Sequence, residues 1–466
     1  MIGVKGWLRG AFVVLLAATA IAVATGSSAS ASTAHFTGTL SNGATWVADV
    51  PSSWNGILLL YSHGFGPPLP ANAPNAETRD ALLARGYALA GSSYDPNGSW
   101  WALNTAVADQ FATIDAVEAA ALPHTPDTVL GFGTSMGGLV SALEAERGAG
   151  VIDGALSTCG IVGGAIHLNN YQLDATYTIA KLLMPAAQAP KLVGFANPGE
   201  GAASGVALTQ AVQAAQQTPE GRARLALVFA FLNVVPAAPG LPTPSPNDAE
   251  AIEAAQYASA VQSFPLLDFI QFGRFWIELA AGGNGSWTRG EDFGALLAHT
   301  PYHDVVRELY REANLDLKSD LATLNAGADV GADPAAIASL EQSSVPTGRL
   351  QVPHLTLHTT ADPLVPVQHE SVYGEVARAA GSGASLRQAY VDRWGHCTFT
   401  AAELVAGVEA LRQRVETGRW GSVAEPQKLQ EAATGLGLGG AAFVHYQPPA
   451  LSGDNGPFDS AGNAAP

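Results

Sequence analysis

Hydrophobic positions between residues 35 and 160 follow two periods in turn. Short apolar runs rich in β-branched and aromatic residues fit strands, and the stretches between them place apolar residues at helical spacing. The strand-like runs are 35–40, 44–51, 56–64, 87–94, 127–133 and 152–160, and the helix-like stretches are 77–86, 104–122 and 136–148. Because this alternation is typical of parallel strands joined by crossover helices, it predicts an α/β fold.

Two of these runs carry further information. The runs 35–40 and 44–51 are joined by "SNG", so we expect them to form an antiparallel pair at the start of the sheet. The run "GILLLYSHG", residues 56–64, begins with five residues that contain no polar side chain. A continuous apolar run of this kind predicts a central strand that is buried on both faces of the sheet.

The alternation breaks between residues 171 and 345. Helix-like stretches follow one another there without strand-like runs, at 172–184, 221–235, 248–262, 265–280 and 302–324. A proline-rich connector, residues 236–248, lies among them. This region predicts a helical cap that is inserted into the α/β core. Within the cap, residues 265–280 are expected to form a buried helix rather than a substrate groove.

Strand-like and helix-like stretches alternate again from residue 350 to residue 418. The predicted chain therefore consists of a first core segment (32–170), the cap (171–345), a second core segment (346–425) and a tail (426–466). Because the tail is rich in Gly, Pro and Ala, we expect it to be loosely packed or disordered.

The first 31 residues have the pattern of an export signal. Lys5 and Arg9 precede the apolar run 11–24, and the small residues "ASA" at 29–31 offer a cleavage site before Ser32. The run is short for a membrane span, so a signal peptide is favoured over an uncleaved anchor. The sequence thus predicts a secreted, extracellular protein without stable membrane insertion.

Charge and cysteine content narrow the choice of partners. The chain has 40 acidic and 22 basic residues, a net charge of −18, and so large a negative charge argues against nucleic acid as a partner. Its two cysteines, Cys159 and Cys397, cannot form a structural zinc site alone, and no histidine cluster at ligand spacing accompanies them. No metal site is therefore predicted.

The stretch "GTSMG", residues 133–137, matches the pattern G-x-S-x-G around Ser135. It lies between a predicted strand and a predicted helix, which is the context in which this motif presents a nucleophilic serine on a sharp turn. Glycines on both sides are needed there, because side chains would collide with the neighbouring strand and helix. The competing interpretation is an ordinary tight turn in a chain with 51 glycines.

A serine nucleophile requires a base and a carboxylate that orients the base. His396 follows the last predicted strand, and Asp362 ends the strand before it, where Pro363 fixes the following turn. These positions favour His396 as the base and Asp362 as its partner. Asp392 is the rival carboxylate, although four residues from His396 it would more easily bond the local backbone.

Backbone amides must also bind the oxyanion that forms on the substrate. The amide of Met136 lies at the start of the helix after Ser135, and the amide of Phe65, in the loop "YSHGFG", is the predicted second donor, with Gly64 as the alternative. Tyr94, Trp100 and Trp101 follow another strand at the same edge of the sheet. They are candidate substrate-binding residues, and packing in the core or in a lid is the alternative.

The order Ser135, Asp362, His396, with an "HG" loop upstream, resembles that of the α/β-hydrolase superfamily. The resemblance extends from about His35 to Gly421, interrupted by the cap. It implies a mostly parallel eight-stranded sheet flanked by helices, a Ser-His-Asp triad at its carboxyl edge, and no metal or organic cofactor. The stretches "PSSWNGILLLYSHGFG" and "GYALAGSSYDPNGSW" resemble secreted actinobacterial hydrolases related to the prolyl-oligopeptidase-like group. Residues 395–420 are similar to the end of secreted esterases of the feruloyl esterase and tannase type.

Those esterases bridge a cysteine next to the histidine to one next to the serine. Thr134 precedes Ser135 here, so that link cannot form in the same way. In the expected fold the loop that carries His396 bends back toward Ser135 and passes the end of the strand that holds Cys159. This predicts a Cys159–Cys397 disulfide, and the alternative is two separate buried thiols.

The main functional prediction is a secreted serine esterase that cleaves a small-molecule or polymeric carboxylic ester. A serine exopeptidase of the prolyl-oligopeptidase-like type is an alternative, for which Asp248, Glu250 and Glu253 in the cap are candidates to bind a substrate's free amine. A binding protein on a catalytically dead hydrolase scaffold is the third interpretation.

Overall fold

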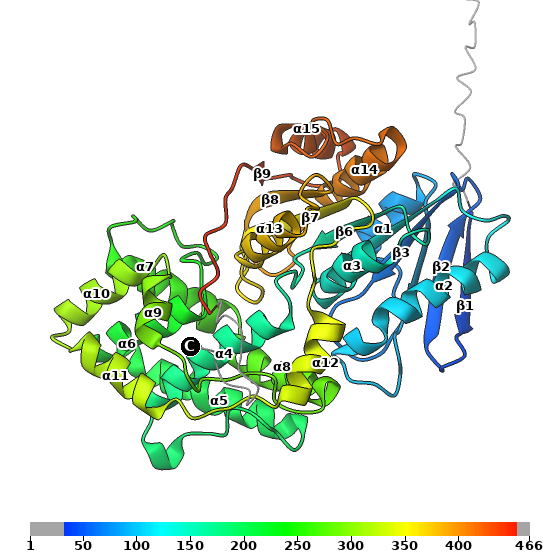
Figure 1. The fold of residues 1–466 in the computed structure, drawn as a ribbon. Coiled ribbons are helices and arrows are strands. Elements are labelled where there is room, and N and C mark those ends of the chain that lie inside the picture. Colours follow the sequence, from blue (N-terminus) through cyan, green and yellow to red (C-terminus); the bar gives the residue numbers. More distant parts are fainter. Residues whose placement is uncertain (1–31, 454–466) are drawn as a thin grey trace, which may run out of the picture.

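The computed structural model describes residues 32–453 as a sheet with helices around it and a helical lobe beside it (Figure 1). Residues 1–31, where the signal peptide is predicted, lie outside the described residues, as do residues 454–466. Among the helices of the described part, none combines the length and the apolarity that crossing a bilayer requires.

The core is a nine-stranded sheet with the order β1-β2-β4-β3-β5-β6-β7-β8-β9. Its strands are β1 (Thr33–Thr39), β2 (Thr45–Pro51), β3 (Ile57–Ser62), β4 (Ala88–Ser92), β5 (Thr128–Thr134), β6 (Gly154–Thr158), β7 (His354–Ala361), β8 (Leu386–Trp394) and β9 (Phe443–Val444). Neighbours from β4 to β8 are parallel, whereas β1–β2, β2–β4 and β8–β9 are antiparallel. The mostly parallel sheet is thus confirmed, and the short β9 extends it at one edge.

Helices cover both faces of this sheet (Figure 1). The hydrophobic cluster on one face includes residues of α1 (Ala76–Leu83), α14 (Ala401–Thr417) and α15 (Pro426–Leu436). The clusters on the other face include residues of α2 (Ala106–Ala120), α3 (Met136–Arg147) and α13 (His369–Ala379).

Strand β3 lies in the middle of this arrangement. Its residue Leu59 belongs to the first cluster, while Leu58 and Leu60 belong to the second. Every residue of β3 is buried, which confirms the prediction of a central strand covered on both faces.

The cap predicted between the two core segments is present as a run of helices between β6 and β7, and no strand interrupts this fully described stretch. It forms the green and yellow lobe of Figure 1. Its helices are α4 (Ala165–Leu182), α5 (Pro198–Ala215), α6 (Pro219–Phe231), α7 (Ala249–Tyr257), α8 (Leu266–Ala281), α9 (Phe293–Ala298), α10 (His303–Glu312), α11 (Leu317–Gly327) and α12 (Pro334–Ser344), with a π-helical turn at Ala258–Ser263. Short 3₁₀ turns occupy Ala102–Asn104 and Ala186–Gln188.

The single helix expected at 302–324 is divided into α10 and α11. Asn314 has a φ of 52°, a left-handed conformation that asparagine tolerates better than most residues and that ends a helix. Asp316 then caps α11 by accepting hydrogen bonds from the amides of Lys318 and Ser319. The helical spacing of apolar residues continues across this break, but Asn314 ends one helix and Asp316 begins the next.

The expectation of a loosely packed tail is wrong for residues 426–453. Helix α15 packs on α14, β9 pairs with β8, and the chain then runs to the cap (Figure 1, red). There the amide of Ser452 donates to Asn233 Oδ1 (2.8 Å), and Asn233 Nδ2 donates to the carbonyl of Ser452 (3.1 Å). Composition suggested disorder, but apolar side chains such as Leu429 and Phe443 are buried and fix the segment.

Candidate active site

Ser135 stands on the turn between β5 and α3. Its φ of 60° is positive, which is rare for a residue with a side chain and marks a strained turn. A Cβ on Gly133 would collide with the carbonyl of Gly137, and one on Gly137 would collide with the carbonyl of Ser62. The two flanking glycines therefore let strand, turn and helix approach closely enough to hold Ser135 in this conformation.

The structure brings Ser135, His396 and Asp362 together at the carboxyl edge of the sheet. His396 Nε2 lies 2.8 Å from Ser135 Oγ, and His396 Nδ1 lies 2.7 Å from Asp362 Oδ2. The other carboxylate oxygen, Oδ1, accepts the amides of Leu364 (2.9 Å) and Val365 (3.0 Å). Burial opposes ionisation of Asp362, but His396 and His358 outweigh it and lower its pKa to about 2. A buried anion thus orients an imidazole toward a serine hydroxyl.

The rival carboxylate lies elsewhere. Asp392 is exposed on β8 and accepts a hydrogen bond from Thr360 Oγ1 (3.2 Å). Of the two carboxylates, the structure places Asp362 against the imidazole.

A second histidine lies beside the carboxylate of Asp362, and no motif in the sequence pointed to it. His358, fully buried on β7, has Nε2 2.9 Å from the carbonyl of Val365 and 3.7 Å from Asp362 Oδ2. Its Nδ1 lies 3.2 Å from Glu370 Oε1. Burial would lower the pKa of His358, but Asp362 and Glu370 raise it to about 10. His358 is therefore a buried cation between two carboxylates.

The loop after β3 lies over Ser135. A Cβ on Gly64 would be 3.2 Å from Ser135 Cβ and 3.7 Å from its Oγ, so the backbone of this loop borders the reacting atom. Phe65, the next residue, lines the same cavity as Ser135. Met136 is the first residue of α3, where a backbone N–H has no partner within the helix. Gly64 and Met136 thus border the serine from two sides, and the amides of Met136 and Phe65, with Gly64 as the alternative, stay the predicted oxyanion donors.

Tyr94 contacts the loop after β3 at His63. The Tyr94 hydroxyl donates to the carbonyl of His63 (3.0 Å), and the two rings stack with centroids 4.2 Å apart. Tyr94 is fully buried and, among the described residues, is not part of the cavity lining. We therefore assign Tyr94 to holding the loop, in place of the substrate contact expected from its position in the sequence.

The two tryptophans occupy different places. Trp101 lines the cavity at Ser135, and its Nε1 donates to Ser344 Oγ in the cap (3.1 Å). Trp100 is not among the described residues that line the cavity. Its ring stacks on that of Trp276 of α8, with centroids 4.7 Å apart, and packs edge-on against Phe65. Only Trp101 of this pair borders the cavity, while Trp100 joins the cap to the loop over Ser135.

A cavity opens at Ser135 between the core and the cap. The core supplies Phe65, Trp101, Ser135, Ile161, Leu364 and Val365, and the cap supplies Leu168 and Gln172 of α4 and Phe269, Ile270, Gly273 and Ile277 of α8. Helix α8 was expected to be a buried helix rather than part of a substrate groove. The helix is buried as predicted, and Ile270 and Ile277 belong to the hydrophobic core while they also line the cavity.

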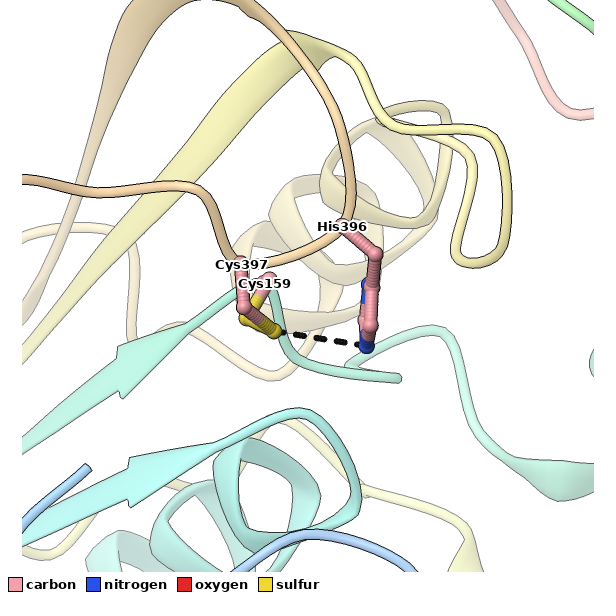
Figure 2. A group of neighbouring side chains, drawn as sticks. All are labelled: Cys159, His396 and Cys397. Atoms are coloured by element: carbon pink, nitrogen blue, oxygen red, sulfur yellow. Dashed lines mark hydrogen bonds between the residues drawn. A yellow bond between two sulfur atoms is a disulfide. The ribbon is translucent and has the colours of Figure 1, made fainter. Parts of the chain in front are cut away.

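The predicted disulfide between Cys159 and Cys397 is present and is confirmed. It joins the loop of His396 to the end of β6, and Cys397 Sγ lies 3.3 Å from His396 Nε2 (Figure 2). Within the described residues, these two cysteines and His396 form a group with the spacing of metal ligands. Because both sulfur atoms are bonded to each other, neither is the thiolate that a metal ion requires.

The sheet order, the serine on its strand–turn–helix junction and the histidine and carboxylate that follow the last long strands define an α/β-hydrolase. The chain is 30% identical over 438 residues to an o-phthalyl amidase from Xanthobacter agilis, and the match covers 86% of this chain and 91% of that protein. The chain therefore belongs to the family of this amidase, and it is a hydrolase.

No family model matches the chain. Among solved structures, it is similar to feruloyl esterase B from Aspergillus oryzae (TM-score 0.39, 14% identity, 83% of this chain and 80% of that chain). It is also similar to an esterase from Pyrococcus furiosus (TM-score 0.37, 10% identity, 83% and 90%). Likeness at this level adds nothing to the family assignment, which rests on the amidase.

Proposed function

We propose that this protein is a secreted serine hydrolase that cleaves carboxylic esters through an acyl-enzyme intermediate on Ser135. One observation carries the proposal: the hydrogen-bonded chain from Ser135 Oγ through His396 to Asp362, with distances of 2.8 and 2.7 Å. The alternative reading of "GTSMG" as an ordinary turn would not require a buried, ionised aspartate and an oriented imidazole beside the serine.

In the proposed reaction, Ser135 Oγ attacks the carbonyl carbon of the substrate while His396 Nε2 takes its proton. The amides of Met136 and Phe65 stabilise the oxyanion of the tetrahedral intermediate, each by about 3 kcal/mol on general precedent. The imidazolium then protonates the leaving alcohol, which departs and leaves an acyl group on Ser135. A water molecule, deprotonated by His396, releases the acid and restores the serine.

Asp362 serves this cycle as a fixed anion. Its low pKa, about 2, keeps it ionised at neutral pH, so it stabilises the imidazolium each time His396 holds the proton. Its two backbone amide partners, Leu364 and Val365, hold the carboxylate in one orientation. The imidazole therefore keeps Nδ1 protonated and presents Nε2 to Ser135.

Amide hydrolysis is the second candidate, because the relative with 30% identity is named as an amidase. The same groups serve both reactions, and the difference lies in the leaving atom. The nitrogen of an amide leaves only after His396 has protonated it, whereas the alkoxide of an ester is a better leaving group than an unprotonated amide nitrogen. Ester and amide substrates with one common acyl group separate the two activities.

The exopeptidase alternative has less support. Asp248 caps α7 by accepting the amide of Ala251, and Glu253 is buried, which raises its pKa to about 7. Neither residue, nor Glu250, is among the described residues that line the cavity at Ser135. A substrate amine at Ser135 would thus lack the acidic partner expected for such an enzyme.

The purified protein tests the proposal with p-nitrophenyl esters, the matching p-nitroanilides and aminoacyl-p-nitroanilides. We expect ester hydrolysis in the wild type and a loss on the order of 10⁴-fold or more in Ser135→Ala, with an unchanged unfolding temperature. A fluorophosphonate probe should label the wild type and spare the variant. Labelling at another serine, or no turnover of any ester or amide, would refute the proposal and favour a dead scaffold.

Secretion is part of the proposal and has its own test. The segment 1–31 supports it, and so does the disulfide, which persists in oxidising compartments. Expression of the full chain in an export-competent host should release a protein that begins at Ser32, as measured by intact mass. Recovery of the full-length chain in the membrane fraction would instead show an uncleaved anchor.

A further inference from the structure

The cavity beyond Ser135 contains a glycine that packing does not explain. Gly273 lies in the interior of α8 and is buried, yet a Cβ added to it would meet nothing within 4 Å. A buried position with open space in front of it faces a void. Because glycine destabilises a helix interior relative to alanine, its presence here calls for another cause.

Glycines of the neighbouring helix α5 show the contrast. A Cβ on Gly205 would lie 2.6 Å from the Cα of Asp268 in α8, so that glycine allows the two helices to approach closely. Gly273 has no such neighbour on the side where its Cβ would project. Its effect is to leave volume in the cavity rather than to bring two helices together.

The cavity lies on one side of the reacting serine. Ser135 and Phe65 line it, but His396 is not among the described residues that do so. In the proposed reaction His396 Nε2 protonates the leaving group, so the leaving group must lie next to the imidazole. The part of the substrate that stays on Ser135 is then directed into the cavity.

The lining also restricts the chemistry of that group. Apart from Ser135 and Gln172, the side chains that line the cavity are aliphatic or aromatic, and none of these described residues carries a charge. Arg274, a cationic residue next to the lining residue Gly273 in the sequence, is buried and donates to Ser286 Oγ and to the carbonyl of Asn169. A carboxylate in the cavity would lose its hydration without gaining a cationic partner, which is costly.

We propose that this cavity is the acyl subsite, that it takes an uncharged apolar acyl group such as benzoyl, and that Gly273 sets its depth. The inference rests on the proposed function, since it concerns the group that Ser135 would carry. With a largely apolar lining and two polar side chains, Ser135 and Gln172, the cavity has the kind of lining that small-molecule sites have. Gly273 is thus a specificity-determining residue.

The test compares kcat/KM for p-nitrophenyl benzoate and p-nitrophenyl acetate, which share one leaving group. Gly273→Val should lower the benzoate-to-acetate ratio by about tenfold or more, since the new side chain occupies the volume of the acyl group. Gly273→Ala should lower it less and, because alanine favours the helix, should raise the unfolding temperature. The alanine variant keeps the test valid if the valine variant does not fold.

Gly435→Val is the matched control. Gly435 also lies in a helix, α15, and a Cβ there also meets nothing within 4 Å, but the residue is exposed and belongs to a helix away from the cavity. It reproduces the change in helix propensity without filling the cavity. We expect the benzoate-to-acetate ratio of this variant to equal that of the wild type.

The possible outcomes separate the two proposals. If the wild type cleaves no ester or amide, the proposed function fails. If it cleaves them but Gly273→Val and Gly273→Ala keep the wild-type ratio, the acyl subsite is refuted while the function stands. Suppose instead that the Gly273 variants keep the wild-type benzoate-to-acetate ratio but change the ratio of kcat/KM between p-nitrophenyl benzoate and methyl benzoate, which differ only in the leaving group. The leaving group would then lie in the cavity, against the inference. Hydrolysis of a 2-carboxybenzoyl ester at the rate of the benzoyl ester would refute the exclusion of charge.

Discussion

The carboxylate of Asp362 uses both of its oxygens, one for His396 Nδ1 and one for the amides of Leu364 and Val365. An asparagine at this position would present an NH₂ group to one of these partners. If its oxygen stayed with the backbone amides, its NH₂ would face Nδ1 and force the proton to Nε2, where it blocks proton transfer from Ser135. Asp362→Asn should therefore lower kcat on the order of 10⁴-fold with little change in the unfolding temperature.

Asp392→Asn is the control for this variant. Asp392 is exposed and its side chain contacts Thr360 Oγ1, so we expect kcat within about twofold of the wild type. Both variants are compared by steady-state kinetics at equal stability. A larger loss in Asp392→Asn than in Asp362→Asn would contradict the assignment of the carboxylate.

The pair of His358 and Glu370 links the site to the stability of the fold. Thr356 Oγ1 and Gln388 Nε2 both donate to Glu370 Oε2 (2.6 Å each), which leaves Oε1 for His358 Nδ1. The neighbouring His369 stays neutral at ordinary pH, because burial and the charge of His358 lower its pKa to about 3. One buried positive charge is thus shared between the carboxylates of Glu370 and Asp362.

This arrangement predicts an alkaline loss of stability. The pKa of His358 is about 10 in the folded protein and near 6.5 in the unfolded chain, so folding holds a proton that unfolding releases. The stabilisation is complete below about pH 6.5 and is lost as the pH rises through 10. Urea unfolding at several pH values should show the free energy of unfolding falling between pH 7 and pH 10.

Glu370→Gln removes one of the two carboxylates that hold this proton. We expect it to lower the free energy of unfolding at pH 7 by about 3 kcal/mol and to flatten the decline toward pH 10. Glu375→Gln, an exposed change on the same helix α13, should leave both properties unchanged. An equally steep alkaline decline in Glu370→Gln would assign that decline to other groups.

At the level of elements, helix α8 shows what hydrophobic periodicity cannot distinguish. Its apolar residues Leu266, Leu267, Phe269, Ile270 and Ile277 all pack in or against one hydrophobic core, but only the last three also line the cavity. An apolar residue has the same pattern in the sequence whether it faces a packed neighbour or an apolar void. The helix was therefore predictable, but its part in the cavity depends on the elements that surround it.

We expect the connector 236–248, which follows α6 in the cap, to be the first site of proteolysis. Residues 239–248 are exposed except for the half-buried Pro244, and they lie outside the helices and strands. Proteases cleave segments that can leave the fold at low cost. Limited digestion with a protease of broad specificity should thus cut first between residues 239 and 248, as identified by fragment mass.

The packing of the tail sharpens this expectation. Residues 426–453 include α15 and β9 and end in the hydrogen bonds between Ser452 and Asn233. We expect this segment to resist the protease while the connector is cut. Earlier cleavage within 426–453 would contradict the packing of the tail, and earlier cleavage between Gly131 and Leu143 would contradict the architecture around Ser135.

For the whole molecule, the parts that could be predicted from the sequence are those with a local signature. The turn at Ser135 has its glycines, and Asp362 and His396 follow strands whose apolar runs are visible, so their order along the chain indicates one edge of the sheet. His358, Glu370 and Gln172 have no such signature. Their contacts arise from the packing of separate elements, β7 against α13 for His358 and Glu370 and the cap against the core for Gln172.

The disulfide connects these distant parts, because it closes 238 residues of sequence and joins the end of β6 to the loop of His396. In the chain-entropy model, a disulfide that closes a loop of this length stabilises the fold by about 5 kcal/mol. Reduction should first free the loop that holds the imidazole, because Cys397 is adjacent to His396 and lies 3.3 Å from its Nε2. We therefore expect ester hydrolysis to fall under reductant before the protein unfolds.

Activity and near-ultraviolet circular dichroism, followed together during titration with a phosphine reductant, test this order of events. Alkylation under denaturing conditions, read by mass, counts the thiols at each point and should find none before reduction. The double variant Cys159→Ser, Cys397→Ser should reproduce the low activity without reductant and should not respond to it. Full activity in the folded, fully alkylated protein would show that the sheet and cap position His396 without the bridge. The disulfide would then stabilise the fold alone, with no part in orienting the base toward Ser135.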